Sequence, residues 1–211
     1  MARDRQVVAR LLDAAGTTYA EDAGIKLRDK PTALFKLLSL CMLASKPIAA
    51  TTAVAAAREL FRTGIRTPSS VLTADRTEMI AAFGRAGYAR YDESSATRMT
   101  RIAARVNDEY GGDLRHLRIR AHHDVNAAGT ALQRFDGIGR TGADIFLREV
   151  QDVWTWAQPY FDERAVATAK LLGLPADAQA LGELAPNCNA RLAAALVRAS
   201  LDDSLRRHIE T

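Results

Sequence analysis

Apolar residues spaced three and four positions apart run through most of this chain, and this spacing limits the possible folds more than any other feature. Such a spacing places side chains on one face of an α-helix. The first run ends at Gly16 and consists of Val7, Val8, Leu11, Leu12 and Ala15. No stretch has the sustained period-two alternation of β-branched residues that is typical of strands. The sequence therefore predicts an all-α fold.

Polar residues and glycines mark the expected helix boundaries. Thr51 or Thr52 is expected to cap one helix, and Asp75 and Asp124 are expected to cap two others, because their side-chain oxygens can accept from free backbone amides. Gly142 is expected to open the helix that carries Ile145, Phe146 and Val150.

Composition excludes several classes of protein. The 211 residues are 48% hydrophobic, enough for a substantial core, and the longest apolar run, 34–44, is far shorter than the roughly 20 residues of a membrane helix. The charged N-terminus lacks a signal-peptide pattern, so we expect a cytoplasmic protein. The net charge of +4 permits nucleic-acid binding without requiring it.

The chain has two cysteines, Cys41 and Cys188, without C-x-x-C spacing or neighbouring histidines. This argues against a zinc or iron–sulfur centre. Cys41 lies in the apolar run and is expected to be a small buried side chain.

A G-x-G turn, Gly137-Ile138-Gly139, separates two segments of helical periodicity. This is a helix-hairpin-helix pattern. Glycines allow the backbone to approach a ligand closely, and the amides that open the second helix can bind a phosphate at the positive end of the helix dipole. Such a turn positions DNA without reading its sequence.

Two other interpretations of this turn remain open. The same residues satisfy G-x-G-x-x-G, with Asp162 following Gly142 at the distance of a dinucleotide-binding fingerprint, but that motif requires a preceding strand. The turn can also be an ordinary helix–helix connection.

Residues 135–144, followed by Tyr160-Phe161-Asp162-Glu163-Arg164, resemble the helix-hairpin-helix and trailing aspartate of the endonuclease III superfamily of DNA glycosylases. The likeness extends roughly over 34–175 and includes the turn Gly87-Tyr88-Ala89-Arg90-Tyr91. It implies two helical lobes, 34–152 and 1–33 with 153–211, with double-stranded DNA lying across the cleft between them and a lesion base flipped out of the stack. A monomer near the nucleoid is expected.

The resemblance makes Asp162 the catalytic candidate. A carboxylate at a helix start can stabilise a developing oxocarbenium ion or activate water, although capping its helix is the simpler role. Bifunctional relatives have a lysine where this chain has Thr141, so the resemblance implies hydrolysis of the N-glycosidic bond without strand cleavage. A non-catalytic DNA-binding protein of the same fold is the alternative.

The resemblance also implies a set of DNA contacts and a cation site. The main-chain oxygens of Gln133, Phe135 and Ile138 would hold a monovalent cation, whereas the iron–sulfur cluster of endonuclease III proper lacks its cysteines here. The expected DNA-binding residues are Gly137, Gly139, Arg140, Gly142, Tyr88, Arg90, Tyr91 and Lys46. Those outside the hairpin can also be ordinary surface residues.

Two further groups have both a functional and a structural interpretation. Trp154 and Trp156 can stack on a base or pack in the core. The basic run of Arg115, Arg118 and Arg120 can face phosphate or solvent, and His122-His123 is expected to be a polar entry to a helix.

Overall fold

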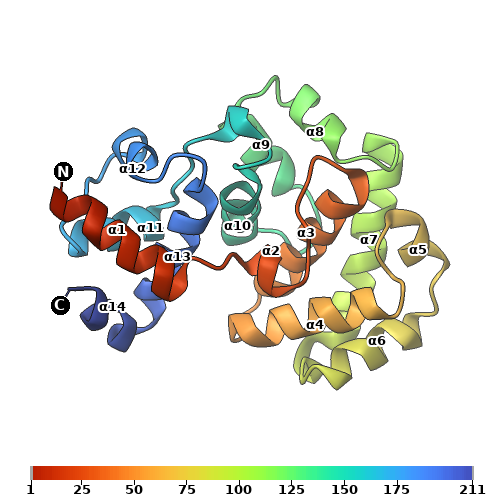
Figure 1. Cartoon of the computed structure of the whole chain (residues 1–211). Helices are drawn as coiled ribbons and strands as arrows, with labels where there is room; N and C mark the ends of the chain where they lie inside the picture. The colour runs from red at the N-terminus through yellow and green to blue at the C-terminus, as the bar shows by residue number, and fades with distance from the viewer. Residues whose placement is uncertain (1, 211) are drawn as a thin grey trace. The chain divides into compact units, whose positions relative to one another are not determined.

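The structure is a computed structural model that describes residues 2–210, and its regular elements are all helical (Figure 1). None of these residues lies in a strand, which confirms the all-α prediction. The α-helices are α1 (Ala2–Ala15), α2 (Tyr19–Asp22), α3 (Pro31–Ala44), α4 (Ala50–Arg62), α5 (Pro68–Thr73), α6 (Arg76–Arg85), α7 (Asp92–Tyr110), α8 (Arg115–Arg120), α9 (Val125–Leu132), α10 (Arg140–Val150), α11 (Glu163–Leu171), α12 (Ala178–Leu184), α13 (Asn189–Leu201) and α14 (Asp203–Glu210). Two short 3₁₀ helices are η1 (Ala89–Tyr91) and η2 (Thr155–Ala157).

The chain divides into two compact units, and their boundaries differ from the predicted ones. The terminal unit contains residues through Tyr19 and from Leu147 onward, and the central unit is Ala20–Phe146. The predicted boundaries lie at 33/34 and 152/153. Residues 20–33 belong to the central unit, where Asp29 forms an ion pair of 2.6 Å with Arg118 of α8. No local pattern in the sequence predicts the pairing of Asp29 with Arg118.

The core of the central unit is built around α3. Lys36 is the one charged residue in α3, and every other residue from Ala33 to Leu43 is buried. A helix that is apolar on all sides is stable only when it is surrounded. Helices α4 and α7 pack against α3, and α6 packs against both α4 and α7.

The core of the terminal unit is formed by α1, α11 and α13. Helix α13 packs against both of the others and against α14. Buried side chains from these helices include Val8, Leu11, Ala165, Leu192 and Leu196. The apolar periodicity at the two ends of the chain thus belongs to a single core.

The predicted helix starts at Asp75 and Asp124 are confirmed, whereas those at Thr51 or Thr52 and at Gly142 are wrong. Asp75 and Asp124 each accept a hydrogen bond from an amide in the first turn of the following helix. Helix α4 begins at Ala50 without a side-chain cap, so Thr51 and Thr52 lie in its first turn. The buried apolar face of α4 stabilises the helix where a cap is missing.

Helix α10 begins at Arg140, two residues before the predicted Gly142. Its first backbone hydrogen bond runs from Ala143 N to Gly139 O at 3.0 Å, which places Gly142 inside the first turn.

Within residues 2–210, no helix combines the length and the apolar character needed to cross a bilayer.

Candidate functional site

The α9–α10 turn, residues 133–139, has a conformation that requires glycine at one position. Gly137 has φ of +82°, in the left-handed region that side chains disfavour. A Cβ atom at this position would also lie 2.6 Å from Cδ of Arg98 in α7. Conformation and close packing therefore both select glycine here.

Gly142 serves packing within the central unit. It is buried, and a Cβ atom there would collide with the Ser45 hydroxyl just after α3. The absence of a side chain lets α10 approach this end of α3. The predicted DNA contact of Gly142 therefore concerns its backbone amide alone.

Gly139 is the glycine that the fold itself does not explain. It is exposed, its φ lies outside the left-handed region, and no other part of the structure comes within 4 Å of the position of a Cβ atom. It immediately precedes α10, whose first amides have no acceptor inside the helix. Arg134, Arg140 and Thr141 are exposed around it. This open, positively charged helix start is suited to a phosphate.

The structure brings together three of the predicted DNA-binding side chains. The Lys46 ammonium lies 5.7 Å from the centre of the Tyr91 ring, and the Arg90 guanidinium lies 5.4 Å from it. Arg90 is exposed, whereas Tyr91 and Lys46 are partly buried. Two cations therefore share one aromatic ring, and we call these residues the Tyr91 cluster. Lys46 follows Ser45, the residue that packs against Gly142 of α10.

Tyr88 is a correction to the predicted interface. Its side chain is completely buried, so it cannot contact DNA or fill a gap in the base stack from this position. Its hydroxyl donates to the Leu43 carbonyl at 2.9 Å, and burial raises the pKa of this phenol. The Leu43 carbonyl belongs to the last turn of α3, where carbonyl oxygens have no amide donor inside the helix. Tyr88 thus holds the end of α3 that leads to Lys46.

Replacing Tyr88 with Phe should lower the free energy of unfolding by about 1–2 kcal/mol, because the Leu43 carbonyl would stay buried without its donor. Urea unfolding of the two proteins measures this loss. Tyr91→Phe, at a ring with greater exposure, is the control and should leave stability nearly unchanged. Equal stability of Tyr88→Phe and the parent would contradict the proposed role of this hydroxyl.

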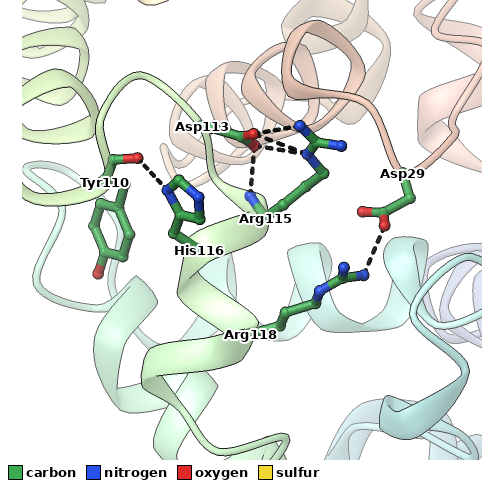
Figure 2. Close-up of polar contacts among 6 residues, drawn as sticks. All are labelled: Asp29, Tyr110, Asp113, Arg115, His116 and Arg118. Carbon is green, nitrogen blue, oxygen red and sulfur yellow. Dashed lines mark hydrogen bonds and ion pairs between the residues drawn. The ribbon is translucent and has the colours of Figure 1, made fainter.

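The basic run of α8 is largely neutralised by carboxylates of the same unit. Figure 2 shows Arg115 held by Asp113, at 2.6 Å in the closest contact, and Arg118 held by Asp29. The hydrogen bonds from Arg115 lower the pKa of the Asp113 carboxyl. Arg120 instead places its guanidinium 5.0 Å from the centre of the Tyr110 ring. Arg118 therefore joins α8 to the segment before α3, whereas Arg115 holds the start of its own helix.

His122 and His123 lie in the turn between α8 and α9, directly before the capping residue Asp124. Both are exposed and both have positive φ, 50° and 57°. This placement agrees with a polar entry to α9.

Asp162, in the terminal unit, is the N-cap of α11. One carboxylate oxygen accepts from the Ala165 amide at 2.9 Å, and the other is paired with Arg148 of α10. Only 8% of the Asp162 side chain and 3% of the Arg148 side chain are exposed. The capping role of Asp162 is thus confirmed, and both of its oxygens have a donor in the folded chain.

Arg148 is the residue that sequence reasoning missed. It lies among apolar residues of α10, and the charged pair Arg148-Glu149 in an otherwise apolar stretch was the available signal. Glu149 is also buried and accepts from the Tyr19 amide at 3.2 Å. Nε of Arg148 has no hydrogen-bond partner within residues 2–210.

Gln151 fixes the segment that leads to Asp162. Its amide nitrogen donates to the Tyr160 carbonyl at 2.9 Å, and its oxygen accepts from the Tyr160 amide at 2.8 Å. The same nitrogen also donates to the Arg148 carbonyl at 3.0 Å. The backbone before Asp162 is therefore held by the side chain of a buried glutamine.

The two tryptophans of the terminal unit stack on each other. Their ring centres are 5.4 Å apart with planes inclined by 25°. Trp154 is 1% exposed and belongs to the core, whereas Trp156 is partly exposed. Trp154 therefore packs in the core, as the structural interpretation predicts. Stacking of Trp156 on a DNA base stays a prediction.

Metal ligands and reactive thiols are scarce in the part of the chain that the structure describes. It contains no group of three or more His, Cys, Asp or Glu side chains placed to hold a metal ion. Cys41 is buried, and burial raises the pKa of the Cys188 thiol.

In the α9–α10 turn, the Phe135 carbonyl accepts from the Ile138 amide at 3.0 Å, which leaves one lone pair for a cation. The cation site at Gln133, Phe135 and Ile138 stays a prediction.

The element before the α9–α10 turn decides one alternative. Helix α9 lies where a dinucleotide-binding fingerprint requires a strand, so that interpretation of Gly137, Gly139 and Gly142 is wrong.

No known family model matches the chain, and no curated protein or solved structure shows significant similarity to it.

Proposed function

We propose that this protein is a monofunctional DNA glycosylase that hydrolyses the N-glycosidic bond of a damaged or mismatched base in duplex DNA. The α9–α10 turn is the hairpin of a helix-hairpin-helix, and α10 directs its first amides to a backbone phosphate. A monovalent cation can bind the main-chain oxygens of the turn. The resemblance of residues 135–144 and 160–164 to the endonuclease III superfamily motivates this assignment.

The observation that carries the proposal is the surface of the central unit. The open backbone at Gly139 adjoins the start of an 11-residue helix, and Arg140 is exposed beside it. Lys46 of the Tyr91 cluster directly follows Ser45, whose hydroxyl lies next to Gly142. Amides at a helix start, basic side chains and an aromatic ring are groups by which proteins hold a DNA backbone and splayed bases.

The proposed chemistry uses Asp162 and water. As the bond between the base and the sugar breaks, positive charge develops on the sugar, and a carboxylate stabilises it while water adds at the same carbon. The base leaves with the bonding electron pair, and the water proton passes to the carboxylate or to solvent. Thr141 supplies no amine at the position where bifunctional relatives form an imine, so the DNA strand stays intact.

A second candidate function is duplex binding without catalysis. The observation that favours it is the environment of Asp162, whose two oxygens are engaged by Ala165 and Arg148 and whose side chain is largely buried. Asp162 caps α11 and neutralises Arg148 whether or not it takes part in catalysis. The two functions differ only in whether a base is released.

Base release from a panel of duplexes distinguishes them. The panel contains alkylated, oxidised, deaminated and mismatched bases, and each reaction is examined before and after alkali. Strand breaks that appear only after alkali would support the glycosylase and identify its substrate. Tight binding without release from any duplex would favour the non-catalytic function, and breaks before alkali would contradict the monofunctional assignment.

Arg140→Ala tests the phosphate contact. If Arg140 touches a phosphate, the variant should bind every duplex more weakly, and the slope of log affinity against log salt should fall by about one. Fluorescence anisotropy over a salt series measures both quantities. Arg62→Ala is the matched control, because Arg62 is an exposed arginine of the same unit that is paired with Glu59. Unchanged binding of Arg140→Ala would remove this residue from the interface.

A further inference from the structure

The contacts of the α9–α10 turn point to a role for two arginines of α7. We propose that Arg98 and Arg101 hold the turn in its phosphate-binding conformation through the carboxylate of Asp136. This inference rests on the proposed DNA binding and adds positioning residues to it. All three residues lie in the central unit.

Asp136 is engaged from two sides. Arg101 Nη1 donates to one carboxylate oxygen at 2.8 Å, and Arg98 Nε lies 3.8 Å from the other oxygen. Arg98 and Arg101 are three positions apart, which places them on one face of α7. Asp136 directly precedes Gly137, the left-handed residue of the turn. The two arginines therefore restrain the turn at its most unusual backbone position.

Arg98 also touches the turn itself. Its Cδ and Nε occupy the space next to Gly137 that a larger residue would need. Its Nη1 is buried and has no hydrogen-bond partner within residues 2–210. A guanidinium nitrogen covered in this way is not available to a phosphate, and its burial costs free energy. The position of Arg98 is explained if it fixes the backbone of the turn.

Charge alone offers a different explanation for these arginines. Two guanidiniums facing one carboxylate leave a net positive charge beside the turn, and this charge would attract DNA without any positioning. The two explanations predict effects of opposite sign when Asp136 loses its charge. A simple increase in positive charge strengthens DNA binding, whereas release of the turn weakens it.

The experiment compares Asp136→Asn with Glu109→Gln in the full chain. Glu109 is an appropriate control because it pairs with Arg105 on the same helix at 2.8 Å, and the exposed fractions of its side chain and that of Asp136 are 30% and 34%. Both variants lose one negative charge. We expect the dissociation constant of Asp136→Asn for an undamaged duplex to rise about tenfold, the size of one charged hydrogen bond. Glu109→Gln should bind as tightly as the parent or more tightly.

Arg101 supplies a second, independent measurement. Its side chain is 69% exposed, so its replacement should leave the fold intact even if Asp136→Asn fails to fold. Arg101→Gln should weaken binding without changing the salt slope, and Arg101→Lys should recover part of the affinity. A slope that falls by about one would mean that Arg101 contacts phosphate directly, and would overturn the positioning role.

The outcomes separate this inference from the proposed function. Asp136→Asn that binds duplex as tightly as the parent, or more tightly, would overturn the inference and leave the proposed function intact. A parent protein that binds no duplex at all would overturn both.

Discussion

Asp162→Asn should strongly slow base release while duplex binding persists. The substitution keeps the shape of the side chain and removes the charge that the proposed mechanism places against the developing sugar cation. The rate of base release should fall by about 10²–10⁴-fold, the range for a positioned catalytic carboxyl group. Single-turnover release from the best duplex of the panel, followed by alkali, measures the rate.

The structure shows that this substitution has a second effect. Asn is a good N-cap, so the hydrogen bond with the Ala165 amide can persist, but buried Arg148 loses its counterion. Activity must therefore be compared at a temperature at which both proteins are folded. Asp177→Asn, an exposed cap of α12 that bonds the Ala180 amide at 2.9 Å, is the matched control and should retain full activity.

The catalytic assignment has a clear contrary outcome. If folded Asp162→Asn releases the base as fast as the parent, another group performs the chemistry, and the role of Asp162 is limited to the cap and its ion pair. If neither protein releases a base, the non-catalytic function is favoured.

Arg148→Met should lower the free energy of unfolding by about 3 kcal/mol, because removing one member of a buried ion pair leaves the other charge uncompensated. The Asp162 carboxylate is 8% exposed and would keep only the Ala165 amide as a donor. Met retains much of the buried volume, so the loss reports on charge more than on packing. Urea unfolding measures it.

The double variant Arg148→Met/Asp162→Asn provides the internal control. Because it removes both charges, it should be more stable than the sum of the two single losses predicts. Arg62→Met, which breaks the exposed pair with Glu59, should have little effect by comparison. Strictly additive losses at 148 and 162 would mean that the pair does not stabilise the terminal unit.

Local features of the fold were predictable. Helical spacing identified the class, and the caps at Asp75, Asp124 and Asp162 could be read directly because each side chain bonds an amide two or three positions ahead. The start of α4 was misplaced because its stability comes from its buried face. The same distinction between local and distant contacts explains which residues of the candidate site could be predicted.

The residues of the candidate site were partly predictable. The sequence predicts DNA contacts at Arg90 and Tyr91 in one turn and at Lys46 in a separate segment, and the structure brings them together. Tyr88 was assigned to the surface because it lies in a turn, but its hydroxyl bonds a carbonyl 45 positions earlier. A turn residue can be buried whenever a distant element covers it, and the sequence contains no periodicity for such contacts.

The sequence by itself determined the helices and the glycine turn at 137–139, because helix formation and left-handed backbone depend on residues within about four positions of one another. Tertiary structure alone decided which charges of different elements are paired. Arg148 with Asp162, Arg101 with Asp136 and Arg118 with Asp29 are separated by 14, 35 and 89 positions. Whether an arginine is available to a phosphate depends on such partners, because a carboxylate within hydrogen-bonding distance competes for the same guanidinium.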